Sequence, residues 1–137
     1  MKKLHIAVCD FKEADCDYTA EAIRMYYMQQ GLDIPVIAKW SADEPFRLNL
    51  KSMADRGEGY DMVFIGADSM PGTDLAHTVR GYGKDCPLFL VSNAMEFAVE
   101  GFRIQALDYL TKPVSPKRIG EAIARADQAK KNGGDKP

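Results

Sequence analysis

The sequence is poor in the residues that build metal centres and disulfide frameworks. Its 137 residues include only two histidines and three cysteines, an odd number with no CxxC spacing. A structural zinc site needs four such ligands at close spacing, so we expect none. We interpret the cysteines as reduced thiols of a cytoplasmic protein.

The sequence also lacks an excess of either charge and a long apolar run. Its 18 basic and 20 acidic residues give a net charge of −2, which offers no electrostatic reason for direct nucleic-acid binding by this domain. No apolar segment approaches the roughly 20 residues that cross a bilayer, so we expect no membrane partner. The N-terminal apolar run stops at Asp10 without a small-residue cleavage site and predicts a strand, not a signal peptide.

What is present is a regular alternation of short apolar runs and amphipathic segments. The short runs predict strands at 4–9, 34–40, 61–66, 87–92 and 107–111. The amphipathic segments predict helices within 13–31, 41–57, 73–83, 93–105 and 115–131. This order predicts a flavodoxin-like (βα)5 fold of the α/β class, a doubly wound five-stranded parallel sheet with helices on both faces. We assign 1–127 to one domain and expect 128–137 to be a flexible polar tail or the start of a linker.

Polar side chains stand where four of the predicted strands end. They are Asp10, Asp68, Ser92 and Lys112. The carboxyl ends of parallel strands meet at one edge of the sheet, so we expect a shared pocket. Carboxylates are ligands for Mg²⁺, and a lysine with a hydroxyl can hold phosphoryl oxygens. The set therefore indicates chemistry on a phosphoryl group near a divalent metal. The first strand is followed by neither a P-loop nor GxGxxG, which argues against nucleotide binding of those kinds.

Four motifs in order resemble the receiver domains of two-component response regulators, the CheY-like superfamily. They are "IAVCD", "YDMVFI…MPG", "LFLVS" and "ALDYLTKPVSP", and the resemblance runs from about residue 3 to 125. The stretch "MEFAVEGFRIQALDYLTKP" is similar to receivers that precede LytTR-type DNA-binding domains. The resemblance implies a signalling domain, not an enzyme, that serves a histidine kinase and a DNA-binding output. It also implies a homodimer through the face of the fourth helix, fifth strand and fifth helix.

The resemblance assigns a role to each residue that matches the family pattern. Asp10 corresponds to a magnesium ligand, Ser92 to the hydroxyl after the fourth strand, and Lys112 to the lysine after the fifth. Tyr109 corresponds to the aromatic residue that reports the switch. Pro113 corresponds to a proline preceded by a cis peptide bond.

The third strand departs from the family pattern at the phosphoacceptor. Counting back from "MPG" places the acceptor at Ala67, and counting along the strand places it at Gly66. Neither residue is acidic, and the nearest acid, Asp68, comes one or two places late. A second acid should follow Asp10, but Phe11 stands there. We therefore expect weakened Mg²⁺ binding by Asp10 and Asp68.

Three functions remain open. The chain is a degenerate receiver that works without phosphorylation, a working receiver whose altered loop swings Asp68 into the pocket, or a flavodoxin-like protein that binds a flavin or another small ligand beside Gly66 and Ala67. The acidic stretch after the first strand disfavours a flavin phosphate. Purely structural roles also remain open, since Asp10 and Ser92 can cap helices and Asp68 suits a turn.

Overall fold

Five short parallel strands form one sheet in the order β2-β1-β3-β4-β5. The computed structural model describes residues 3–93 and 103–134. The strands are β1 (His5–Cys9), β2 (Val36–Trp40), β3 (Met62–Gly66), β4 (Leu88–Ser92) and β5 (Asp108–Thr111). The chain starts near the middle of the sheet and extends it to both sides, which confirms the predicted doubly wound topology.

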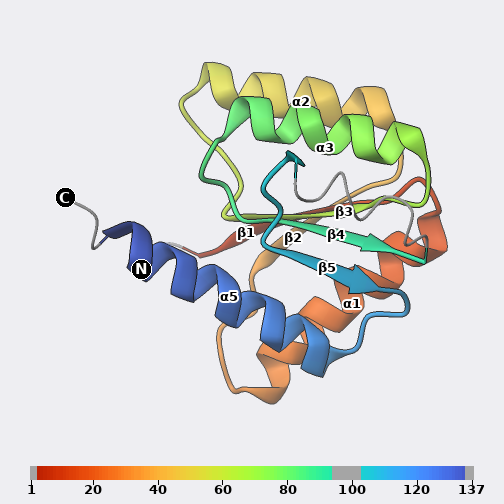
Figure 1. The fold of residues 1–137 in the computed structure, drawn as a ribbon. Coiled ribbons are helices and arrows are strands. Elements are labelled where there is room, and N and C mark those ends of the chain that lie inside the picture. The colour runs from red at the N-terminus through yellow and green to blue at the C-terminus, as the bar shows by residue number, and fades with distance from the viewer. Residues whose placement is uncertain (1–2, 94–102, 135–137) are drawn as a thin grey trace.

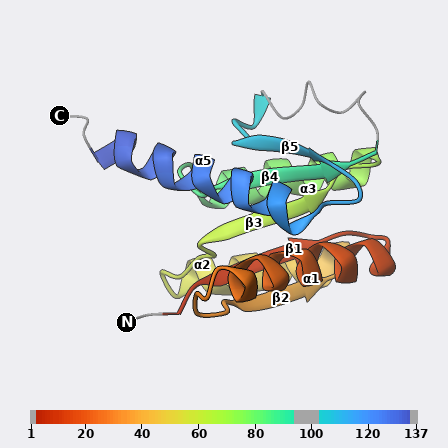
Figure 2. The same cartoon turned by 90° about the horizontal axis from the view of Figure 1, so that it is seen from below.

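The described helices cover both faces of the sheet. They are α1 (Glu13–Gln29), α2 (Asp43–Asp55), α3 (Met70–Tyr82) and α5 (Pro116–Gly134). Helices α1 and α5 contact each other on one face, and α2 and α3 contact each other on the opposite face (Figure 1). Figure 2 shows the molecule from below, with α1 and α5 in front of the strands and α2 and α3 behind them. The predicted helix at 93–105 lies largely outside the described residues.

The apolar runs of the strands reflect burial on both faces. Along β3, Phe64 packs into the layer under α1 and α5, whereas Val63 and Ile65 pack under α2 and α3. Phe64 also stacks on Phe89 of β4, with ring centroids 4.7 Å apart. A strand that alternates between two apolar layers needs apolar residues throughout, so it reads as a continuous run.

The start of α3 is the boundary that matters for the site. The sequence predicted this helix within 73–83, but it begins at Met70, with Pro71 in its first turn. A proline there loses no hydrogen bond, because the first N–H groups of a helix have no intrahelical acceptor. Only 67–69 therefore connect β3 to α3.

Several other boundaries also differ from the prediction, and β1, β3 and β4 each begin one residue later than predicted. Strand β2 begins at Val36, since Pro35 has no N–H to donate to the sheet, and β5 begins at Asp108. Helix α5 continues to Gly134, beyond the predicted end at 131, and the assignment of 128–137 to a flexible tail or the start of a linker stays a prediction. Residues 128–131 have side chains of high helix propensity, whereas the Asn-Gly-Gly that follows does not. The domain boundary at 127 stays a prediction.

Arg80 joins the end of α3 to the segment that precedes β5. Its guanidinium donates to the carbonyls of Ile104 and Gln105 and to three carbonyls within 83–86, over 2.7–3.1 Å. One of these acceptors, Gln105, has a φ of 56°, in the left-handed region, so Arg80 contacts a turn of unusual backbone conformation. One half-buried side chain thus satisfies backbone acceptors on two loops.

We expect Arg80→Met to destabilise the domain by about 2–4 kcal/mol, because it removes charge-assisted hydrogen bonds and leaves carbonyls without donors. Urea unfolding measures the change. The matched control is Arg24→Met, which removes an exposed guanidinium paired with Glu21 and should leave the midpoint nearly unchanged. Equal midpoints for the two variants would contradict this role of Arg80.

Candidate functional site

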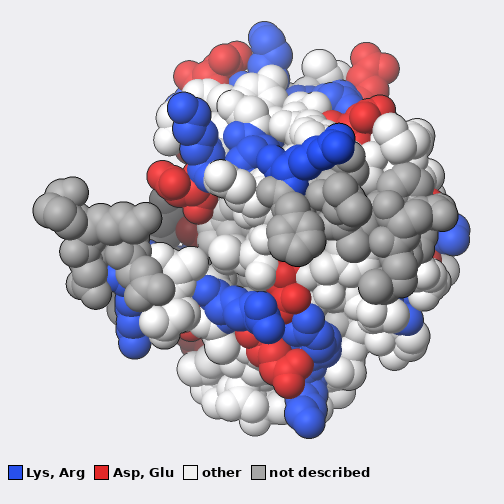
Figure 3. All heavy atoms as spheres, viewed as in Figure 1, with Lys and Arg blue, Asp and Glu red and all other residues white. Residues whose placement is uncertain are grey.

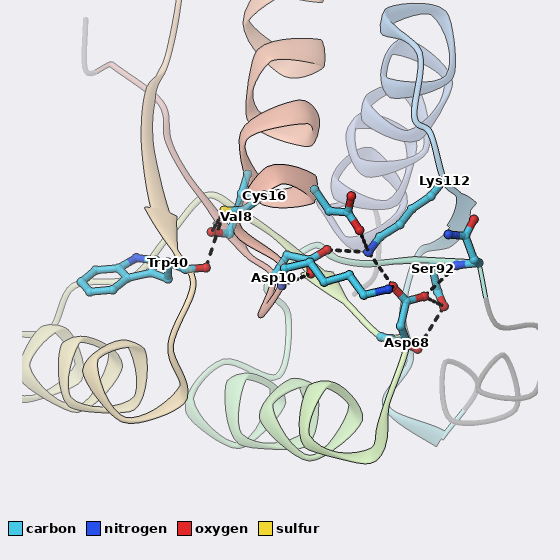
Figure 4. A network of polar contacts seen from close by, with 11 residues as sticks. Val8, Asp10, Cys16, Trp40, Asp68, Ser92 and Lys112 are labelled. Carbon is cyan, nitrogen blue, oxygen red and sulfur yellow. Dashed lines mark hydrogen bonds and ion pairs between the residues drawn. The ribbon is translucent and has the colours of Figure 1, made fainter.

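The site is organised around the ammonium group of Lys112, directly after β5. Its Nζ atom lies 2.7 Å from Asp10 Oδ2, 2.8 Å from Asp15 Oδ2 and 2.6 Å from Asp68 Oδ2. The Lys112 side chain is only 7% exposed. Figure 4 shows it reaching between Asp10 and Asp68. An ammonium has three N–H donors, so these carboxylates satisfy it completely.

The cluster keeps Lys112 charged. Burial alone lowers the pKa of Lys112, but its hydrogen bonds to Asp10, Asp15 and Asp68 outweigh burial and raise the pKa above the usual value. The exposed ammonium of Lys12 lies 3.8 Å from Asp68 Oδ2 and adds a second positive charge. Two ammonium groups thus face three carboxylates, leaving a net charge of −1.

The Asp68 carboxylate points into the cluster from the loop between β3 and α3. Its Oδ1 atom accepts from the Ser92 hydroxyl at 2.6 Å and from the Asn93 backbone N–H at 2.8 Å, and Oδ2 faces Lys112. Burial raises the pKa of Asp68, but the donors Lys112, Ser92 and Asn93 outweigh it, so the pKa falls to about 2. Asp68 is ionised at neutral pH, with donors on both oxygens.

The two predicted acceptor positions face different surroundings. A side chain at Gly66 would point into the cluster, where its Cβ atom would overlap the carboxylate of Asp10. Ala67 is fully buried in the core under α2 and α3. Gly66 thus leaves room for Asp10, and Ala67 contributes to the core.

Gly72 sets how closely α3 approaches the strand that carries the site. A Cβ atom at Gly72 would overlap the backbone oxygen of Gly66. The first turn of α3 therefore packs directly on the end of β3, and the 67–69 loop is short. This close packing holds Asp68 at the mouth of the cluster.

Three further groups of the site were not predicted from the sequence: Asp15, Lys12 and the Asn93 backbone amide. Asp15 lies in the first turn of α1, which starts at the same edge of the sheet as the end of β1. This placement was the available signal for an acid that reaches Lys112. Phe11, where the second acid was expected, instead packs against the core under α2 and α3.

The structure places the remaining predicted residues around the cluster. The Lys112–Pro113 bond is cis, as predicted. Tyr109 is partly buried against the core under α2 and α3, and its switch role stays a prediction. A cavity of about 200 Å³ opens beside the site, with Asp15, Asn93, Lys112 and Pro113 among its lining residues.

The carboxylates do not fit a magnesium ion as they are arranged. The Lys112 ammonium lies where oxygens of Asp10, Asp15 and Asp68 converge. Within 3–93 and 103–134, no group of three or more acidic, histidine or cysteine side chains is placed to hold a metal ion. Magnesium binding by Asp10 and Asp68 stays a prediction.

The surface offers no broad field of one charge on the face that Figure 3 shows. Basic and acidic side chains are interspersed there among the described residues. Arg118 and Arg125 of α5 both contact the carboxylate of Asp108 in β5, at 2.8 and 3.2 Å. In the described part of the chain, no helix has the length and apolarity needed to cross a bilayer.

Two curated relatives are bacterial regulators. No protein-family model matches the chain. It is 31% identical over 136 residues to the transcriptional regulatory protein RprY of Bacteroides fragilis, covering 96% of this chain and 53% of that protein. It is 33% identical over 75 residues to the sensory transduction protein LytR of Staphylococcus saprophyticus, covering 53% of this chain and 29% of that protein. The chain thus spans about half or less of the length of these relatives.

Solved structures share the fold at low sequence identity. A CheY-like receiver domain from Methanospirillum hungatei superposes with a TM-score of 0.72 at 17% identity, covering 96% of this chain and 99% of that one. The receiver domain of the response regulator AraT from Geobacillus stearothermophilus gives 0.71 at 21% identity, covering 98% and 100%.

The low pKa of Asp68 predicts a loss of stability in acid. An unfolded aspartate titrates near pH 3.9, whereas folded Asp68 titrates near 2. Its stabilising contribution is therefore present above about pH 4 and is lost as the pH falls towards about 2. Urea unfolding between these pH values should show a steep loss for the wild type and a shallower one for Asp68→Asn. Asp74→Asn, at an exposed site on α3, serves as control. Identical pH dependences of the wild type and Asp68→Asn would contradict the assignment.

Proposed function

We propose that this chain, a CheY-like response regulator receiver domain, signals by protein contact without phosphorylation of an aspartate. The observation that carries the proposal is that no free carboxylate stands at the expected phosphoacceptor position. Gly66 and Ala67 have no carboxylate, and the oxygens of the adjacent Asp68 already accept hydrogen bonds from Ser92, Asn93 and Lys112.

Phosphoryl transfer to a carboxylate depends on positioning and on neutralising the developing charge. The attacking oxygen needs a free lone pair directed at phosphorus. In Asp68, Oδ1 has two donors and Oδ2 contacts an ammonium. The low pKa of Asp68 also makes its carboxylate a weak nucleophile. Because the Lys112 ammonium occupies the meeting point of the carboxylates, a metal ion would have to displace it.

A working receiver phosphorylated on Asp68 is the second candidate. One observation favours it: the Asp68 side chain reaches the pocket, remains 18% exposed and contacts both Ser92 and Lys112. The attacking oxygen Oδ2 would be one whose charge the Lys112 ammonium already neutralises, at 2.6 Å. This weak nucleophilicity is why we rank phosphorylation of Asp68 below signalling without phosphorylation.

The partners in this proposal are proteins. We assign the chain a histidine kinase or another signalling protein as its partner, in the cytoplasm, and a homodimer through the face that includes β5 and α5. The fourth helix of that face lies outside the described residues. A DNA-binding output would belong to an attached or separate domain, and this domain itself has no enzymatic role.

Intact-mass spectrometry after incubation with acetyl phosphate and Mg²⁺ tests the proposal. The wild type and Asp68→Ala should both keep their mass, because neither has a free, correctly placed acceptor. Circular dichroism checks that both are folded. A stoichiometric, acid-labile gain of one phosphoryl group by the wild type alone would establish phosphorylation of Asp68 and refute the proposal.

A further inference from the structure

Three hydrogen-bond donors converge on the carboxylate of Asp68. They are the Ser92 hydroxyl at the end of β4, the Asn93 backbone N–H and the Lys112 ammonium after β5, at 2.6–2.8 Å. Hydroxyl, amide and ammonium donors that meet at one point favour a negatively charged oxygen group.

The donors have supports besides the Asp68 side chain. Ser92 is 1% exposed and belongs to a strand, and the Asn93 amide is part of the backbone that follows. Lys112 is held from its other side by Asp10 and Asp15, at 2.7 and 2.8 Å. Their backbone positions are thus set by β4 and β5, and the ammonium is held by β1 and α1, although the Ser92 hydroxyl also contacts the carbonyl of Ala67 in the loop at 3.0 Å.

Asp68, in contrast, is an anion that the chain itself carries to the donors. It belongs to the short 67–69 loop, which the packing of Gly72 on Gly66 holds in place. A ligand on the same chain has a high effective concentration and outcompetes free anions at ordinary levels. The arrangement is that of a binding site with its ligand attached.

We propose that the Asp68 carboxylate is a permanent internal anion bound to the oxyanion donors Ser92, Asn93 and Lys112. The proposal rests on the function proposed above, signalling without phosphorylation. The Asp68 carboxylate takes the place of a phosphoryl group. It holds the ends of β4 and β5 in the position that a bound oxyanion would impose.

Emptying the pocket should convert it into a site for a free oxyanion. Asp68→Ala removes one negative charge, so Lys12 and Lys112 then balance Asp10 and Asp15. The adjacent cavity, which Asn93 and Lys112 help to line, gives solvent a path to the donors. Phosphate or sulfate oxygens can then accept the three hydrogen bonds that Asp68 leaves.

The test is titration of Asp68→Ala with inorganic phosphate, and separately with sulfate, at constant ionic strength. We expect the Asn93 amide resonance of the variant to move away from its wild-type position and to return saturably as phosphate is added. At tenfold excess over Kd, the melting temperature of the variant should rise by about 3–5 °C. Wild type and Asp74→Ala should not respond, since the first keeps its internal anion and the second changes a carboxylate elsewhere.

The other possible results of the titration each support or overturn the internal-anion proposal. A folded Asp68→Ala that responds to neither anion overturns the internal-anion proposal. So does a variant that is unfolded without phosphate and remains unfolded with it. Neither result affects the proposed function, which fails only if acetyl phosphate labels wild-type Asp68. A variant that folds only when phosphate is added supports the pocket.

Discussion

The interaction on which the site depends is the contact of one buried ammonium with three carboxylates. Lys112 follows β5, whereas Asp10, Asp15 and Asp68 come from the end of β1, the first turn of α1 and the loop after β3. A lysine that is 7% exposed is costly unless it is fully paired. Since each partner comes from a different element, the requirement to pair Lys112 restricts how all four elements meet. The same ammonium lies where the carboxylates would otherwise meet a cation.

Two small residues make this arrangement sterically possible. Gly66 leaves the space that the Asp10 carboxylate occupies, and Gly72 lets α3 pack on the end of β3. The short 67–69 loop then carries Asp68, one or two places after the expected acceptor position. The absence of a side chain at 66 and the carboxylate at 68 thus fit one steric arrangement, in which Asp10 occupies the space beside the strand end and Asp68 enters the cluster from the loop.

The alternation of apolar runs and amphipathic helices was sufficient to predict the fold, because burial on both faces of a parallel sheet has a direct signature in residues such as Val63, Phe64 and Ile65. Placing Asp10, Ser92 and Lys112 at one edge followed from the topology. The direction of Asp68 could not be predicted, since it depends on how tightly Gly72 lets α3 approach. Asp15 was missed for a related reason: an acid in the first turn of a helix is common, and only the spatial position of Lys112 distinguishes it. The start of α3 was misplaced because Pro71 was read as part of a loop, although it also suits a first helical turn.

Helix α5 adds a mechanical property to the domain. Its C-terminal part continues past the edge of the sheet (Figure 1), and residues 127–131 are exposed after the buried Ala126. At a rise of 1.5 Å per residue, its 19 residues make a rod about 28 Å long. The rod starts at Pro116, four positions after Lys112, and Arg118 and Arg125 brace it against Asp108 of β5. By geometry alone, a tilt of about 10° at its base would displace its tip by about 5 Å, so small shifts after β5 would be larger at the end of the helix.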